Sequence, residues 1–357
     1  MARRVLILLG TNKGAFFMEG NADRSAWDLQ GPFCDTLPIN HVIADDQGTI
    51  YCGGGNRWTG PYVWRTDDGG RSWTKSSTGL TYGEEPVKAV WSLARCGSRL
   101  YAGVEPAGLF RSDDDGQTWE HVSALRDHPS RPEWQPGGGG LILHSIVPHP
   151  DDPRKLWVAI SAAGVFYTED EGLSWEPRNR GTRADYNPED DRYPEYGQCV
   201  HALAMAPGRP DQLYQQNHCG MYRSDDGGRS WRSIEAGLPT SFGFPAAVHP
   251  RDRETLYLVP LNGDSIGRYV PDGKAAVWRT RDGGRTWRDF RKGLPQENTF
   301  FTVLRQAMAT DDFSPAGIYF GTNTGSLFAS LDEGESWNGI AHHLPLIQSV
   351  KTFMIER

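Results

Sequence analysis

Short apolar segments alternate with turn-forming residues along the whole chain, and three kinds of segment recur in a fixed order. The first kind is apolar after an initial His or Trp: 41–44, 91–94, 144–147 and 201–204. The second resembles Leu-Tyr-Ala-Gly-Val: 100–104, 156–160 and 213–216. The third begins with Gly and ends in an aromatic residue: 108–110, 164–166 and 220–222. Segments this short, bounded by Gly- and Asp-rich turns, predict the successive strands of a repeated all-β unit.

A fourth part of the repeat is an Asp- and Gly-rich turn that ends in Trp. Six copies read Ser/Thr-x-Asp/Glu-x-Gly-x-Ser/Thr-Trp or a close variant, and a weaker seventh precedes them: 65–73, 111–119, 167–175, 223–231, 279–287, 329–337 and, for the weaker copy, 21–27. The Trp residues are 46, 46, 56, 56, 56 and 50 residues apart, the period of a four-stranded propeller blade. We expect Asp to accept hydrogen bonds from turn amides, Gly to adopt positive φ, and Trp to anchor the returning strand.

These turn segments resemble the Asp boxes, or BNR repeats, of the sialidase-like and sortilin-type propellers, and the resemblance covers nearly the whole chain. It implies an all-β, seven-bladed β-propeller of four-stranded blades, a single domain over residues 1–357. The first strand of the chain, at Val5, is then the second strand of a blade. Residues 349–355 supply its missing first strand, so that both ends of the chain share one blade and close the ring.

Composition and charge narrow the function classes. At 38% hydrophobic residues the chain can bury a large core, but its formal net charge of −8 and the lack of a basic stripe exclude nucleic acid as an expected partner. No segment reaches the roughly 18 apolar residues of a membrane span. Five cysteines without a CxxC pair, together with an apolar N-terminal run too short for a secretory signal, predict a cytoplasmic protein with reduced thiols. We expect no nucleotide cofactor.

Strand direction divides the propeller into two ends. The start of each inner strand and the end of each second strand lie at one mouth of the central channel, whereas the Asp-rich turns lie at the opposite end and are predicted to be structural. The residues predicted at the first mouth are His41, Trp91, His144 and His201 at inner-strand starts, Glu105, Asn217 and His218 at second-strand ends, and Arg305, Asn56 and Arg57 nearby.

This mouth suits proton transfer or metal-assisted chemistry. Imidazoles can bind a divalent transition metal, and one with a pKa near 6.5 can act as a general acid or base. The predicted metal ligands are His41, His144, His201 and His218. The predicted catalytic residues are His144 and His201 as bases, Glu105 as acid/base partner, and Arg305, which would orient a substrate carboxylate. The alternative is that repeat-derived histidines only form hydrogen bonds around the channel. Three interpretations of Cys199 and Cys219 stay open: they are soft metal ligands, they form a disulfide with each other, or they are small buried side chains.

Two long segments between blades, 120–143 and 176–200, open on the same mouth, and long loops in a compact domain often bind ligands. The alternative is a solvated insertion. The predicted substrate-binding residues are Trp91, Arg57, Asn217, Tyr196 and Trp134. The mixed charge and aromatic content of these loops suit a polar ligand of moderate size.

The favoured function is therefore a hydrolase or lyase that acts on a small polar or glycoside-like substrate at the histidine-lined mouth, with possible metal assistance. Sialidase activity is not predicted, because the Arg-Ile-Pro segment of that family is absent. The alternative function is a non-catalytic ligand-binding or assembly propeller, similar to sortilin-type domains or photosystem assembly factors.

Overall fold

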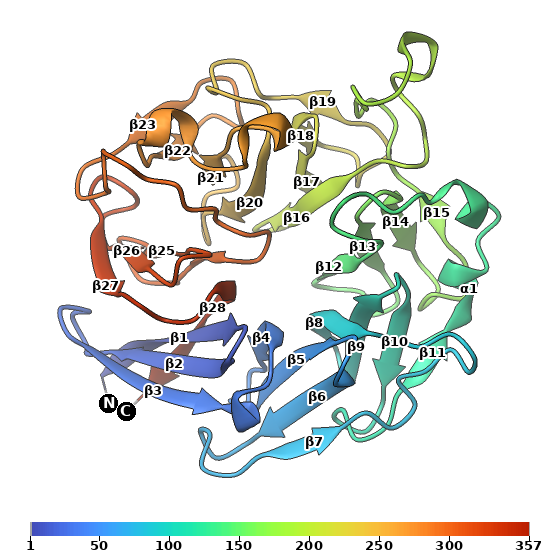
Figure 1. Cartoon of the computed structure of the whole chain (residues 1–357), viewed down its shortest axis with the longest axis horizontal. Coiled ribbons are helices and arrows are strands. Elements are labelled where there is room, and N and C mark those ends of the chain that lie inside the picture. Colours follow the sequence, from blue (N-terminus) through green and yellow to red (C-terminus); the bar gives the residue numbers. More distant parts are fainter. Residues whose placement is uncertain (1, 357) are drawn as a thin grey trace.

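The computed structural model describes residues 2–356 and forms a ring of seven four-stranded antiparallel sheets (Figure 1). This confirms the predicted seven-bladed β-propeller. The inner strands surround the central axis, and the apolar core lies between neighbouring sheets: one cluster, for example, joins Tyr51 and Val63 of one blade to Leu93 and Phe110 of the next. Among the described residues, no helix has the length and apolar character that a membrane crossing requires.

The strands of each blade follow one another in the chain, apart from the inner strand of the first blade. From the inner strand outwards, the blades are β28 (Ile347–Glu356), β1 (Arg3–Thr11), β2 (Gly14–Gly20), β3 (Trp27–Phe33); β4 (Ile39–Ala44), β5 (Ile50–Asn56), β6 (Gly60–Thr66), β7 (Thr74–Ser76); β8 (Ala89–Cys96), β9 (Arg99–Glu105), β10 (Leu109–Ser112), β11 (Glu120–Val122); β12 (Leu143–Pro148), β13 (Leu156–Ile160), β14 (Gly164–Thr168), β15 (Glu176–Pro177); β16 (Val200–Ala206), β17 (Arg209–Asn217), β18 (Gly220–Ser224), β19 (Arg232–Ser233); β20 (Gly243–Val248), β21 (Leu256–Pro260), β22 (Val277–Thr280), β23 (Arg288–Phe290); and β24 (Met308–Thr310), β25 (Ile318–Gly321), β26 (Leu327–Ser330), β27 (Asn338–Ala341).

Helical structure is confined to single turns in the connecting segments. These turns are η1 (Cys34–Thr36), α1 (Ser123–Arg126), η2 (Arg131–Glu133), η3 (Glu189–Asp191), η4 (Asp264–Ile266) and η5 (Pro271–Gly273).

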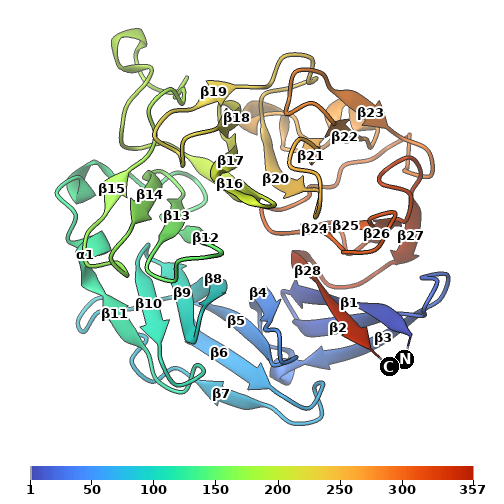
Figure 2. The ribbon, with the colours of Figure 1, turned by 180° about the vertical axis from the view of Figure 1, so that it is seen from behind.

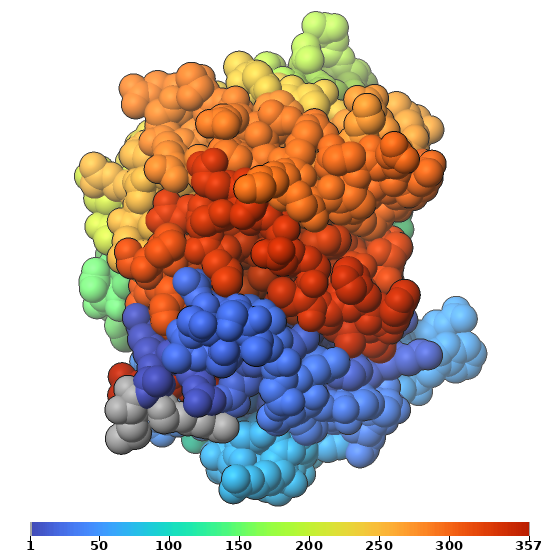
Figure 3. All heavy atoms as spheres, turned by 90° about the vertical axis from the view of Figure 1, so that its left-hand side faces the viewer, coloured from blue at the N-terminus to red at the C-terminus, as the bar shows by residue number. Residues whose placement is uncertain are grey.

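The two ends of the chain close the ring in one blade, as predicted. Strand β28 pairs antiparallel with β1 from Arg3↔Glu356 to Thr11↔Ile347. The blue N-terminal and red C-terminal segments lie side by side in Figures 2 and 3. Because β28 pairs with β1, the first blade has four strands like the others and the channel-side edge of β1 is covered.

The Asp-rich turns join the third and fourth strands of each blade, and their hydrogen bonds explain the residue pattern. Asp226 Oδ1 accepts from Ser230 N at 2.9 Å and from Ser224 Oγ at 2.7 Å, while its Oδ2 accepts from Ser230 Oγ at 2.6 Å. Gly228 adopts φ +86° in this turn, which a side chain would disfavour. The indole of Trp231 then donates to Arg178 O of the preceding blade at 2.8 Å.

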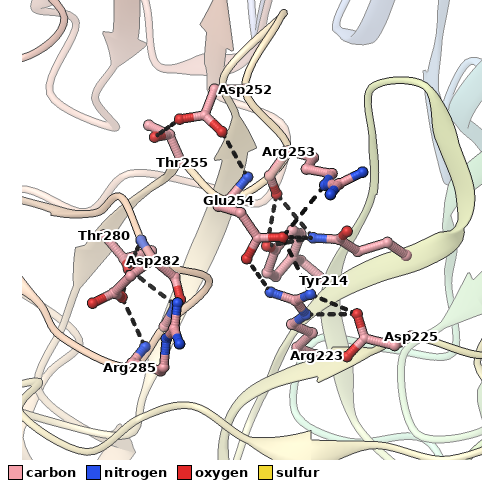
Figure 4. Close-up of polar contacts among 12 residues, drawn as sticks. Tyr214, Arg223, Asp225, Asp252, Arg253, Glu254, Thr255, Thr280, Asp282 and Arg285 are labelled. Atoms are coloured by element: carbon pink, nitrogen blue, oxygen red, sulfur yellow. Dashed lines mark hydrogen bonds and ion pairs between the residues drawn. The ribbon is translucent and has the colours of Figure 1, made fainter.

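The Asp-rich turns also form part of the contact between neighbouring blades. Figure 4 shows the next copy of the turn, in which Asp282 accepts from Thr280 Oγ1 at 2.8 Å and from Arg285 N at 2.9 Å. Beside it, Arg223 pairs with Glu254 of the following blade. The Asp-rich turns thus stabilise hairpins and blade junctions.

Candidate functional site

The pairing register is interrupted near the start of the inner strand in six blades, and in four of them the skipped residue bears on where the polar side chains point. In β8, β12 and β16, the residue that the register skips is Trp91, His144 or His201, respectively. In β4 the skipped residue is Asn40, so His41 lies one position beyond the equivalent site. A bulge leaves one residue unpaired and redirects its side chain, which a count of sequence positions does not reveal.

Polar side chains at these bulges link successive inner strands. His144 Nε2 donates to Val200 O at 2.8 Å, and His201 Nδ1 donates to Gly243 O at 2.7 Å; both acceptors are the first residue of the next inner strand. Similarly, Asn40 donates to the Val90 carbonyl at 2.9 Å. These contacts match the hydrogen-bonding role that the alternative interpretation of the histidines anticipates.

Of the predicted metal ligands, His144 is hydrogen-bonded at both ring nitrogens and His41 at one. His41 Nδ1 accepts from Leu93 N at 2.9 Å, and its buried Nε2 has no hydrogen-bond partner. Burial, together with the charge of Lys351, holds the pKa of His41 well below its usual range. Both ring nitrogens of His144 are engaged, with Val200 O and Ser145 Oγ, and burial followed by the charge of Arg305 lowers its pKa to about 3.

The central channel holds a cavity of about 890 Å³ lined by residues of the inner strands, among them His41, His144 and Lys351. The Gln306 amide crosses between blades and donates to the carbonyls of Trp91 and His144. Next to it, Arg305 lines both this cavity and a second pocket at the mouth. Arg305 therefore lies at the boundary between channel and mouth.

The second pocket has a volume of about 600 Å³ and is built largely from the three long connecting segments. The segment between β11 and β12 contributes Gly137–Gly140, the segment between β15 and β16 contributes Tyr186 and Tyr196, and the insertion between β21 and β22 contributes Asp264 and Arg268. The rigid ring supplies the floor of the pocket, where side chains from the inner strands are exposed to the loops.

Arg305 is the arginine of the pocket that has no counter-ion among the described residues. Its guanidinium carbon lies 4.9 Å from the centre of the Phe244 ring, its Nε is buried without a hydrogen-bond partner, and no ion pair among residues 2–356 includes it. Burial lowers the pKa of Arg305, but a guanidinium remains protonated in proteins. By contrast, Arg268 is paired with Asp264. An anionic group entering the pocket would therefore meet an unneutralised cation.

Cys199, His201 and His218 gather on the floor of the pocket. The Cys199 sulfur lies 3.6 Å from His201 Nε2, and one ligand atom from each of the three residues lies within 4.8 Å of the others. The rings of His201 and His218 meet edge to face with centroids 5.4 Å apart. His218 Nε2 lies 3.9 Å from Asp264 Oδ2, and burial is the main cause of the lowered pKa of His218.

The other predicted residues are placed as follows. Glu105 is held by Lys88 Nζ at 3.3 Å and by the indole of Trp91 at 3.1 Å. Asn217 is fully buried and donates to Gln198 and Gln215, while Trp134 is buried and donates to Ser130 Oγ. Arg57 is exposed and stacks on Trp58 in the β5–β6 turn. Of the five predicted substrate-binding residues, Tyr196 is the one that lines the mouth pocket.

Sequence reasoning missed Tyr186, Asp264, Arg268 and Phe244 as pocket residues. Tyr186 donates to Gly197 O at 2.9 Å and accepts from Cys199 N at 3.1 Å, so its loop is fastened to the mouth. Asp264 and Arg268 belong to the insertion between β21 and β22. The pairing of these two residues, four positions apart in a loop, has no sequence signature.

Comparisons with known proteins agree with this architecture. No protein-family model matches the chain. The chain is 22% identical over 319 residues to an oligoxyloglucan-reducing end-specific xyloglucanase of Emericella nidulans, covering 79% of this chain and 34% of the relative. It is also 27% identical over 258 residues to a xyloglucanase of a Paenibacillus species, and the match covers 65% of this chain and 23% of that relative. The chain thus spans about a third or less of the length of these relatives.

Solved structures share the fold. The GH74 xyloglucanase from Xanthomonas campestris superposes with a TM-score of 0.59 at 19% identity, covering 84% of this chain and 45% of that one. A putative 6-phosphogluconolactonase from Bacteroides uniformis gives 0.60 at 12% identity and covers 98% and 99%. YCF48 bound to a D1 peptide gives 0.55 at 16%, covering 85% and 83%. The chain is therefore similar to proteins of several functions on one propeller scaffold.

Proposed function

We propose that this protein is a hydrolase that acts on a carbohydrate-type substrate bearing a carboxylate or phosphate, which binds in the mouth pocket against Arg305. The observation that carries the proposal is the guanidinium of Arg305, which has no ion-pair partner among residues 2–356 and lines a pocket of about 600 Å³. A charge-assisted hydrogen bond to an anion in such a site contributes about 1.5–3 kcal/mol. The similarity to xyloglucanases supports a carbohydrate as the substrate class.

Proton transfer falls to the polar groups beside that anion. Tyr186 and His218 lie edge to face with ring centroids 5.8 Å apart, and Asp264 lies beside His218. Hydrolysis of a glycosidic bond uses a proton donor at the leaving oxygen and a base that activates water. We assign both roles to carboxyl groups of the pocket, where Asp264 lies beside His218 and Glu133 and Glu195 also form part of the lining.

The test combines binding and turnover with a matched pair of arginine variants. Uronic-acid oligosaccharides and xyloglucan oligosaccharides, which carry no carboxylate, are titrated calorimetrically into the wild type, Arg305→Gln and Arg57→Gln. The expected result is acidic-sugar binding that weakens about 10- to 150-fold in Arg305→Gln and is unchanged in Arg57→Gln, an exposed arginine outside the pocket lining.

The product then distinguishes the reaction. Release of new reducing ends supports hydrolysis, whereas an unsaturated product that absorbs in the near ultraviolet would indicate a lyase. Binding of the acidic sugar without any product over hours would favour the non-catalytic ligand-binding alternative. Equal binding of both sugar classes, insensitive to Arg305, would refute the assigned substrate class.

A further inference from the structure

We propose that Cys199, His201 and His218 form a binding site for a divalent transition metal, with Zn²⁺ as the expected ion and one coordination position open to the mouth pocket. The site lies on the pocket floor, where each residue offers one ligand atom within 4.8 Å of the other two. This ligand set differs from the one predicted from sequence. His41 and His144 form hydrogen bonds with backbone groups and are not included, and Cys199 is added.

The spacing of two of the ligand atoms fits a tetrahedral metal. With Zn–S near 2.3 Å, Zn–N near 2.05 Å and an angle of about 109°, the sulfur and nitrogen should be about 3.5 Å apart. Cys199 Sγ and His201 Nε2 are 3.6 Å apart. The wider spacing allowed for His218 requires a small rotation of its ring, which is partly exposed at 27% of its side-chain surface.

The backbone brings these ligands together, and a neighbouring carbonyl orients one of them. Cys199 directly precedes β16, and its carbonyl accepts from His218 N at 2.9 Å beyond the end of β17. His201 Nδ1–H donates to Gly243 O at 2.7 Å, which fixes the tautomer and leaves the lone pair of Nε2 directed at Cys199. Metal-binding histidines typically donate their second N–H to a carbonyl or carboxylate in this way.

The donor set and the surrounding charges determine the class of ion. One sulfur and two imidazoles select Zn²⁺ or a similar transition metal over Mg²⁺ or Ca²⁺, which prefer oxygen ligands. With Cys199 as a thiolate, its negative charge lies in the same pocket as the guanidiniums of Arg305 and Arg268. A divalent ion bound to Cys199, His201 and His218 would add positive charge beside Arg305, where an anionic ligand would bind.

The experiment uses Co²⁺ as a spectroscopic substitute for Zn²⁺, on chelator-treated protein kept under a non-thiol reductant and without any sugar. We expect one Co²⁺ per chain and a near-ultraviolet thiolate-to-cobalt charge-transfer band, which Zn²⁺ then displaces. Cys199→Ser should abolish the band and weaken Zn²⁺ binding at least about 100-fold, as loss of a direct ligand should exceed the 10- to 100-fold cost of losing an outer partner. His218→Gln should weaken binding similarly.

Cys219→Ser is the matched control, because Cys219 is adjacent to His218 but its sulfur accepts from Asp185 N and does not belong to the ligand group. It should retain the band and bind Zn²⁺ within about threefold of the wild type. His201 is not varied, because its bond to Gly243 supports the blade junction. Circular dichroism verifies folding, and His218→Gln provides the test if Cys199→Ser does not fold.

Three results would overturn the metal site: no stoichiometric binding by the wild type, a charge-transfer band that survives Cys199→Ser, or a band lost in Cys219→Ser instead. Rapid alkylation of Cys199 by iodoacetamide that Zn²⁺ does not slow would also count against it, and would indicate a metal-free thiol–imidazole pair. These measurements contain no sugar, so their failure would leave the proposed hydrolase function untouched, and failure of that function would leave them unaffected.

Discussion

The buried histidine that joins two blades makes the stability of the propeller depend on pH. His144 is 1% exposed, and its pKa is about 3 in the folded protein against an ordinary value of 6.5. At pH values between about 3 and 6.5, the His144 imidazole is protonated in the unfolded chain and neutral in the folded chain. Stability from this residue is therefore complete above pH 6.5 and is lost as the pH falls towards 3.

The magnitude follows from the two pKa values. At about pH 5, the difference in proton binding corresponds to a loss of about 2 kcal/mol in the free energy of unfolding relative to pH 7.5. The perturbation is His144→Gln, because the glutamine amide can still donate to Val200 O but does not titrate. We expect the wild type to lose about 2 kcal/mol more than this variant between the two pH values.

The assay is urea unfolding at both pH values, with refolding checked and the transition followed by fluorescence and circular dichroism. His342→Gln, at an exposed position, is the control and should behave like the wild type. A loss of equal size in His144→Gln and wild type would refute the reasoning. The same conclusion would follow if nuclear magnetic resonance showed that the His144 ring titrates near pH 6.5 in the folded protein.

Three further predictions concern the scaffold. Asp226→Ala should lower the free energy of unfolding by about 2 kcal/mol because three hydrogen bonds to turn groups are lost, whereas its exposed neighbour Asp225→Ala should cost at most about 1 kcal/mol; urea unfolding of both compares them. Gln306→Glu should destabilise by at least about 2 kcal/mol, and more than Gln306→Ala, because a carboxylate would face the two carbonyls that the amide now contacts; thermal unfolding ranks the two. Removal of β28 should leave the channel-side edge of β1 unpaired and yield aggregated protein in size-exclusion chromatography, and a soluble monomer would contradict this.

The fold was predictable from sequence because every blade carries its own signal. Regular Trp spacing set the period, the Asp-rich turns marked the third and fourth strands, and the apolar segment at 349–355 matched the strand missing beside Val5. These signals are local, so each can be recognised in the sequence without knowledge of distant contacts. The strand pairing then confirmed the count of seven blades and the shared terminal blade.

The site was less predictable because side-chain direction depends on features that sequence does not display. The bulge in β4 falls on Asn40 and not on His41, so an alignment that looked regular is off by one residue. His201 and His218 approach each other because β16 and β17 pair next to Cys199. The positions of the other pocket residues, including the ion pair of Asp264 and Arg268, depend on loop conformation.

A repeated ring acquires a specific site where the repeat is broken. Asn40, His144 and His201 each donate to a carbonyl at the start of the next inner strand, so this position serves the scaffold in several blades. The features specific to the mouth pocket are Arg305, which has no ion-pair partner among the described residues, Cys199 beside His218, and the long loops that enclose them. Ligand preference can therefore change through the loops while the hydrogen bonds between inner strands, which join the blades around the channel, remain in place.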